Sequence, residues 1–290
     1  MLLTEDILRL FPQAVSEQLR IESARAGEPV EEIRCRMGKP YQLRCSCSEF
    51  LLPDLRVSAH DLDFILERAS DCSYHAYEQE LSSGFIHAAG GCRIGLCGTI
   101  TQSGIHAISS VSVRIPHEVK GCAQPILPEL LSGGFASTLI LSPPGAGKTT
   151  FLRDLIRSLS ELGLRISVAD ERGEIAAVTR RQEQFDLGTH TDVMTGGVKA
   201  EACMMLLRAM NPQIIALDEI TAPADVEAMF CAAGCGVSLL ATAHAGNAQE
   251  LHRRRLYRNL LREGVFHRAV EIRNVNGKRT YKVVELRCGF

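Results

Sequence analysis

Four short, almost wholly apolar runs recur through the second half of the chain. They are STLILS (137–142), RISVAD (165–170), QIIALDE (213–219) and VSLLATAH (237–244). Stretches with apolar residues at helical spacing separate them. This alternation is typical of a parallel sheet covered by helices. We therefore expect an α/β domain over residues 121–290, in which 266–287 forms two strands joined by a turn at Asn276-Gly277.

The first 120 residues show a different pattern, which predicts a smaller mixed α+β domain. Apolar residues at helical spacing predict two helical segments, 7–19, interrupted at Pro12, and 58–70, capped by Ser58. Alternating apolar and polar residues predict strands, which lie at 31–45, 84–100 and 109–119. The segment 121–135 is rich in glycine and proline, so we interpret it as the connection between the domains.

The composition argues against several kinds of partner and site. The formal net charge of −2 gives no general reason to expect nucleic acid or an anionic membrane as a partner. Neither a secretory signal nor an apolar run of the length needed to cross a membrane is visible. The 11 cysteines lack zinc-finger spacing, so we expect small buried thiols in a reducing cytosol.

The stretch LSPPGAGKTT (141–150) nearly matches the phosphate-binding pattern G-x-x-x-x-G-K-[ST], with Ser142 in place of the first glycine. It follows an apolar strand and precedes a predicted helix, which is the required context. A serine fits if its φ angle stays negative. We expect the loop to bind a nucleotide with its residues Pro144, Gly145, Ala146, Gly147, Lys148, Thr149 and Thr150. Lys148 would bind the β- and γ-phosphates, and the Thr149 hydroxyl would ligate Mg²⁺.

An acidic pair strengthens this prediction. Asp218 and Glu219 end a buried strand, where carboxylates are costly unless a positive group lies opposite. A metal nucleotide supplies that positive group. Asp218 would then hold Mg²⁺ through water, and Glu219 would orient and deprotonate the attacking water.

Two further strands end in polar residues. Asp170, Glu171 and Arg172 follow one strand, and Thr242 and His244 end another. Because ligands gather at the carboxyl ends of parallel strands, we expect these residues to face the same crevice. Glu171 would share the water-positioning role with Glu219. His244 is either a structural histidine or a sensor of the γ-phosphate.

Four segments together resemble the stage III sporulation protein AA group within the secretion-type ATPases, which power type II secretion and type IV pili. The segments are LSPPGAGKTTFLRDL, VADERGEIAAV, LRAMNPQIIALDEI and LATAHAG. Arg208 and the following NPQIIALDEI match the group's Walker B region, and Thr242 and His244 its histidine box. In GTHTDVMTGGVKA, Gly196-Gly197 depart from the usual pattern, so no role is assigned to Lys199.

The resemblance covers most of the chain and implies a RecA-like P-loop ATPase. It also implies a homo-oligomeric, hexameric ring that uses ATP and Mg²⁺. The ring would act from the mother-cell cytoplasm, peripheral to the membrane around the forespore, on membrane-embedded sporulation channel proteins. Such rings complete each site with arginines from a neighbouring N-terminal domain. Arg93 and Arg114 lie in the matching segments, and the plainer interpretation of each is a solvent-facing strand arginine.

A basic run, 251–268, is expected to form one helix. Its arginines are Arg253, Arg254, Arg255, Arg258, Arg262 and Arg268. The arginines either form a solvated helix face, which is the commoner case, or bind an acidic partner or nucleic acid. The absence of interleaved aromatic residues makes nucleic acid an unfavoured partner. Two rivals to a secretion-type ATPase therefore stay open: a nucleic-acid-stimulated ATPase, and a scaffold that binds ATP without turnover. Glu219 argues against the scaffold.

Overall fold

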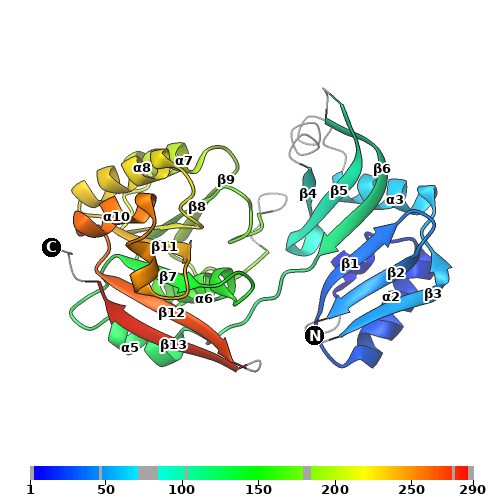
Figure 1. The fold of residues 1–290 in the computed structure, drawn as a ribbon, viewed down its shortest axis with the longest axis horizontal. Coiled ribbons are helices and arrows are strands. Elements are labelled where there is room, and N and C mark those ends of the chain that lie inside the picture. The colour runs from blue at the N-terminus through cyan, green and yellow to red at the C-terminus, as the bar shows by residue number, and fades with distance from the viewer. Residues whose placement is uncertain are drawn as a thin grey trace. The chain divides into compact units, whose positions relative to one another are not determined.

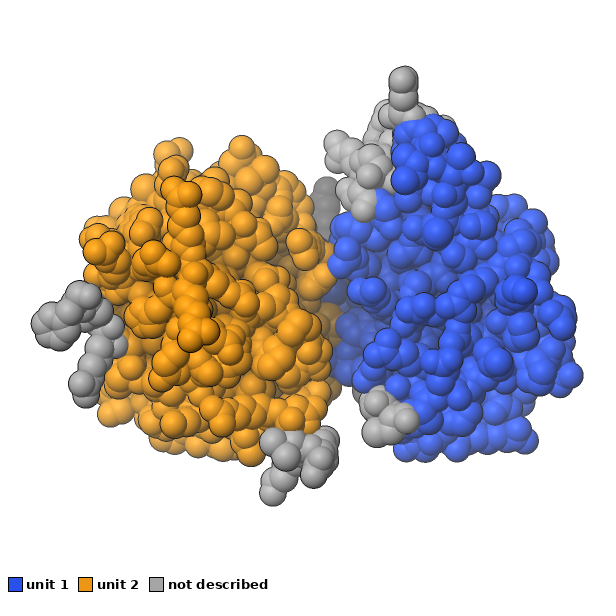
Figure 2. Space-filling view, viewed as in Figure 1, with its two compact units in different colours: residues 1–117, 177–184 blue, residues 118–176, 185–290 orange. Residues whose placement is uncertain are grey.

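The structure is a computed structural model that describes residues 3–45, 48–70, 84–101, 104–178, 184–275 and 278–286 (Figure 1). The chain divides into two compact units, coloured separately in Figure 2. Unit 1 comprises residues 1–117 and 177–184, and unit 2 comprises 118–176 and 185–290. The sequence placed a single boundary at residue 120 and did not anticipate that 177–184 belongs with the first unit.

Unit 1 is built on a six-stranded antiparallel sheet in the order β3-β2-β1-β6-β5-β4. Its strands are β1 (Val30–Arg36), β2 (Pro40–Cys45), β3 (Glu49–Arg56), β4 (Phe85–Ala88), β5 (Cys92–Thr101) and β6 (Gly104–Arg114). Its helices are α1 (Glu5–Leu8), α2 (Gln13–Ala26), α3 (Ala59–Ser70) and the short 3₁₀ turn η1 (Ala89–Gly91). The helices and the sheet share one apolar core.

Local sequence signals explain the helix limits in unit 1. Pro12 separates α1 from α2 and precedes the first residue of α2, as predicted. At α3 the Asp61 N–H donates to the Ser58 hydroxyl at 3.1 Å, and the Ser58 N–H donates back to the Asp61 carboxylate at 2.9 Å. This reciprocal cap satisfies two N–H groups that the helix itself leaves unpaired.

Unit 2 contains a seven-stranded sheet in the order β13-β12-β7-β11-β10-β8-β9. Its strands are β7 (Thr138–Ser142), β8 (Ile166–Asp170), β9 (Thr191–Thr195), β10 (Ile214–Leu217), β11 (Ser238–His244), β12 (Arg268–Val275) and β13 (Lys278–Glu285). Only the β12–β13 pair is antiparallel, and the other pairs are parallel. The expected α/β fold is confirmed. The turn predicted at Asn276-Gly277 lies outside the described residues.

Helices cover both faces of this sheet. They are η2 (Gln124–Ile126), α5 (Leu127–Leu130), α6 (Lys148–Glu161), α7 (Lys199–Ala209), α8 (Pro223–Gly234), α9 (Ala248–Leu251) and α10 (Arg255–Arg262). Residues of α7, α8 and α10 share one apolar cluster with alternate residues of β7, β10 and β11, for example Leu139 and Leu141 of β7. Because neighbouring strand residues point to opposite faces, Ile140 faces the other side, where α6 packs on β7 and β11. The helix that follows the phosphate loop is thus held against its own strand.

The prediction of a single helix at 251–268 is wrong. The chain forms α9, a turn, and α10, and Arg268 is already the first residue of β12. The Arg268 N–H donates to the Ser137 carbonyl, which starts the pairing of β12 with β7. The Arg268 side chain contacts Glu285 at 2.9 Å. Sheet pairing therefore competes successfully with helix continuation after Gly264.

No helix in the described part of the chain is long and apolar enough to cross a membrane.

Candidate nucleotide-binding site

The polar strand ends of unit 2 meet at one edge of the sheet. In the parallel register, Ser142 at the end of β7 lies beside His244 at the end of β11. Leu217, directly before Asp218, lies beside Ala169 of β8 and Ala241 of β11. The strands β7 and β11 therefore extend beyond β8 and β10 at this edge, and the predicted site residues at the four strand ends come together.

The loop between β7 and α6 has the backbone conformation that a phosphate loop needs. Gly145 and Gly147 have φ angles of 74° and 98°, in the left-handed region that favours glycine. Ser142 is not among the described residues with positive φ, and its hydroxyl donates to the Pro143 carbonyl at 2.8 Å. The condition under which serine was expected to replace glycine is thus met.

Lys148 is the first residue of α6, and its ammonium group is nearly buried. Its Nζ lies 2.6 Å from Nδ1 of His244, and Nε2 of His244 lies 3.2 Å from the Glu219 carboxylate. An ammonium can only donate, and Nδ1 is its nearer partner, while Nε2 lies 3.2 Å both from Nζ and from the Glu219 carboxylate. Lys148, His244 and Glu219 thus form a continuous polar chain from the phosphate loop to the acidic pair.

Burial sets the electrostatics of Lys148. Desolvation lowers the pKa of its ammonium group below the usual value, and the carboxylates of Glu219, Asp218 and Glu174 partly oppose the change. A desolvated cation gains more from an added anion than a solvated one does. The charge therefore suits a phosphate group.

Asp218 and Thr149 offer oxygen donors at the same edge. The hydroxyl of Thr242, which is fully buried, donates to one oxygen of Asp218 at 3.0 Å. The second carboxylate oxygen of Asp218 does not take part in this bond. Thr149 and Thr150 follow Lys148 in the first turn of α6, where they are half-buried. Hydroxyl and carboxylate oxygens are the ligands that Mg²⁺ prefers, together with phosphates and water.

The two acids at the end of β8, Asp170 and Glu171, have different surroundings. The Asp170 carboxylate is buried and accepts the N–H groups of Glu174, Ile175 and Ala176 at 2.9–3.0 Å. Burial raises its pKa despite these bonds. Asp170 thus fixes its own loop and does not face the crevice expected from the sequence. Glu171, by contrast, is partly exposed.

Lys199 is the residue that the sequence left without a role. It begins α7 and is 4% exposed. Its ammonium group donates to the backbone carbonyl of Glu219 and lies 3.4 Å from Glu171 and 4.0 Å from Asp225. A buried cation thereby connects the acidic loop after β8 to the acidic pair after β10. Its partners are distant in sequence, so no local pattern indicates this role.

Four arginines singled out in the sequence are divided between the two units. Arg93 and Arg114 are directly paired neighbours on β5 and β6 of unit 1, and the Arg93 guanidinium stacks over Phe85 at 3.9 Å. Arg172 and Arg208 are exposed in unit 2.

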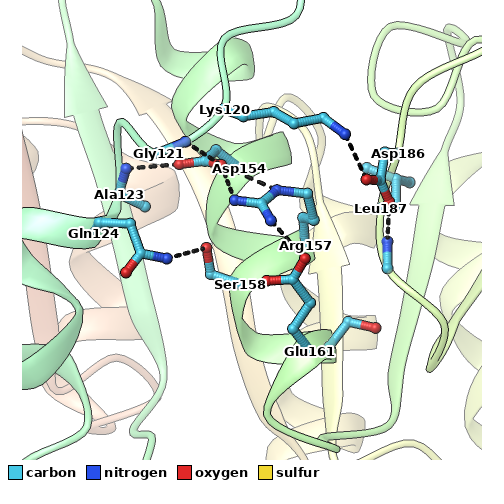
Figure 3. Close-up of polar contacts among 12 residues, drawn as sticks. Lys120, Gly121, Ala123, Gln124, Asp154, Arg157, Ser158, Glu161, Asp186 and Leu187 are labelled. Atoms are coloured by element: carbon cyan, nitrogen blue, oxygen red, sulfur yellow. Dashed lines mark hydrogen bonds and ion pairs between the residues drawn. The ribbon is translucent and has the colours of Figure 1, made fainter.

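A second polar cluster ties α6 to the segment that enters unit 2 (Figure 3). The buried Asp154 of α6 accepts the N–H groups of Gly121 and Ala123 at 2.8 and 2.7 Å, and it pairs with Arg157 at 2.7 Å. Nearby, Lys120 pairs with Asp186 at 2.6 Å. The helix that begins at the phosphate loop therefore also anchors residues 121–123.

The fold of this chain resembles the RecA-like P-loop fold of the secretion ATPases. Its fold is similar to the ATPase DotB of Legionella pneumophila, with a TM-score of 0.61 at 15% identity over 94% of this chain and 81% of that one. It is similar also to the pilus retraction motor PilT solved with ADP, with a TM-score of 0.61 at 17% identity over 91% and 82% of the two chains.

The chain belongs to the family "Sporulation stage III, protein AA", whose model matches residues 3–284. It is 33% identical to stage III sporulation protein AA of Bacillus subtilis (strain 168) over 95% of this chain and 92% of that protein. The family resemblance expected from the sequence is confirmed.

Proposed function

We propose that this chain hydrolyses ATP with Mg²⁺ and works as a motor or assembly ATPase during spore formation. The observation that carries the proposal is the polar chain from Lys148 through His244 to Glu219. It joins a cation for phosphate binding to a carboxylate placed to act on water. A site that only binds a nucleotide has no need of the second group.

The residues fit the nucleotide and the metal. Gly145 has open space where a Cβ would point, and the N–H groups at the start of α6 suit an anion. Lys148 would bind the β- and γ-phosphates, while Thr149 and Asp218, the latter through water, would hold Mg²⁺. When bound, Mg²⁺ neutralises charge that develops on the phosphate oxygens.

The proposed chemistry then belongs to Glu219. Its carboxylate would take the proton of the attacking water, and His244 would hold that carboxylate in place until Lys148 turns to the phosphate. Lys199, bound to the Glu219 carbonyl, would fix the backbone from which Glu219 acts. Glu171 pairs with the same lysine and would share with Glu219 the positioning of the water.

The finer assignments come from the family and the fold. Stage III sporulation protein AA is a sporulation protein by name, and DotB and PilT are described as an ATPase and a retraction motor. We infer a hexameric ring on the mother-cell side of the forespore membrane, where it would energise membrane-embedded channel proteins. Arg93 and Arg114 would complete the site of a neighbouring subunit.

The test is Mg²⁺-dependent ATP hydrolysis measured against protein concentration, for the wild type, Glu219→Gln and Glu227→Gln. Glu227 is an exposed glutamate of α8 and serves as the matched control. Specific activity should rise with concentration as the ring forms. It should nearly vanish in Glu219→Gln while ATP binding persists, and Glu227→Gln should match the wild type. Normal turnover in Glu219→Gln would show that the base is assigned wrongly.

A further inference from the structure

The guanidinium group of Arg279 lies against the phosphate loop. Arg279 is an exposed residue of β13, the edge strand of the sheet in unit 2. A Cβ atom built on Gly147 would lie 3.0 Å from its Nε and 3.2 Å from its Cζ. Gly147 directly precedes α6, so this arginine from the C-terminal hairpin lies beside the N-terminus of the helix.

A stacking contact fixes this placement. The ring of Tyr281 in β13 stacks on the ring of Phe151, with centroids 4.9 Å apart and an interplanar angle of 28°. Phe151 lies in the first turn of α6 and is 1% exposed. Because residues two apart in a strand point to the same face, Arg279 faces α6 together with Tyr281. The position of the arginine therefore follows from how the strand packs on the helix.

No carboxylate in the described part of the chain pairs with the charge of Arg279. Among the residues that the structure describes, none makes a hydrogen bond or an ion pair with its guanidinium. Lys148, in contrast, is engaged by His244 and surrounded by acids. A guanidinium matches two phosphate oxygens at once, and it does so more specifically than an ammonium. The absent side chain of Gly147 leaves room for the guanidinium against the loop.

We propose that Arg279 binds the polyphosphate of the nucleotide held by its own subunit. This inference rests on the proposed function, because it needs a nucleotide in the loop. Each subunit then carries a phosphate-binding arginine of its own, in addition to any that a neighbour supplies. Two cations, Lys148 of α6 and Arg279 of β13, approach the phosphates from different elements, so the C-terminal hairpin becomes part of the binding site.

The test compares Arg279→Gln with Lys282→Gln by titration calorimetry, using Mg-ATP and inorganic tripolyphosphate as probes. Lys282 is an exposed cation of the same strand. It is three residues from Arg279, so its side chain lies on the other face of the sheet, and in the register it pairs with Glu271 of β12. Arg279→Gln should bind both probes roughly 10- to 100-fold more weakly, as the loss of a charge-assisted hydrogen bond predicts. Lys282→Gln should bind as the wild type, and Arg279→Lys should fall between the two.

Each contrary result has its own meaning. Wild-type affinity of Arg279→Gln for both probes would overturn the role of Arg279 and leave the proposed function standing. Weaker binding of ATP with unchanged binding of tripolyphosphate would place the contact on the base or ribose, against the proposal. A wild type that binds neither probe would refute the proposed function together with this inference. Equal melting temperatures of the nucleotide-free variants would exclude a folding defect as the cause of weaker binding.

Discussion

Nζ of Lys148 lies 2.6 Å from Nδ1 of His244, so the start of the phosphate-loop helix is bonded to the end of the neighbouring strand. The other nitrogen of the imidazole faces Glu219 at 3.2 Å. An added phosphate would compete with His244 for the lysine. The same histidine would then be released on one side while still bonded on the other, which makes it suited to report whether the γ-phosphate is present.

Replacing His244 tests this arrangement. His244→Ala should lower turnover by about 100-fold, as expected when a group that positions the general base is lost, while Mg-ATP affinity changes little. His252→Ala, an exposed histidine of the same unit, is the matched control. Steady-state hydrolysis and calorimetric binding separate the two effects. A loss of affinity as large as the loss of turnover would contradict a role confined to positioning.

Replacing Lys199 tests the buried connection. Lys199→Met keeps most of the side-chain volume but leaves Asp225, which is 5% exposed, without its nearby cation. We expect the free energy of unfolding to fall by about 3 kcal/mol, because removing one partner leaves an uncompensated buried charge. Urea denaturation measures this change. Lys199→Arg, which keeps the charge, should lose less, and a methionine variant as stable as the wild type would rule out the connection.

The stability of unit 2 should depend on pH through Asp154. Burial raises the pKa of this carboxyl, but hydrogen bonds from the Ala123 N–H, Arg157 and the Gly121 N–H outweigh burial and lower it below the usual value. The folded protein therefore binds this proton less readily than the unfolded chain. The contribution is complete above about pH 4, the ordinary value for an aspartate, and it is lost as the pH falls through the lowered pKa.

Denaturant unfolding at several pH values between neutrality and acid checks this prediction. Asp154→Asn should lower stability at pH 7 by about 2 kcal/mol, because the asparagine amide replaces a charged acceptor of several bonds. Its stability should also fall less steeply in acid than that of the wild type. Asp192→Asn, an exposed aspartate of β9, is the control and should leave the pH profile unchanged.

Mixing inactive variants tests the proposed action of Arg93 and Arg114 on a neighbouring subunit. The double variant Arg93→Ala/Arg114→Ala lacks the donated arginines, and Glu219→Gln lacks the base. If the arginines act between subunits, a mixture should regain hydrolysis, since some sites then combine an intact Glu219 with intact arginines. Mixed samples that stay as inactive as the separate proteins would mean that the arginines do not act on the site of a neighbouring subunit.

The sequence predicted the parts of the fold whose signals are local. The buried strands β7, β8, β10 and β11 are continuous apolar runs, and each lies within its expected segment. The edge strands β3 and β9 were missed. Only one residue of β3 is buried, and it contains Pro53, while β9 has none that are buried. An exposed edge strand lacks the apolar pattern on which the prediction depends.

The same limit applies to the candidate site. Lys148, Asp218, Glu219 and His244 lie at or after the carboxyl ends of predictable strands. Their proximity could therefore be inferred from the parallel arrangement of those strands. The positions of Lys199 and Arg279 depend on long-range packing, for example that of Tyr281 on Phe151. Asp170 was grouped with the site acids because the sequence cannot show that its carboxylate turns back to its own loop.

The ordinary backbone conformation of Ser142 has a consequence for how such proteins are found. A left-handed backbone favours glycine in a loop, and the backbone is left-handed at Gly145 and Gly147 but not at Ser142. A genome search that insists on glycine at the first position of the pattern would pass over this chain. A search that weights the two left-handed glycines, and accepts any small residue at the strand end, would retrieve it.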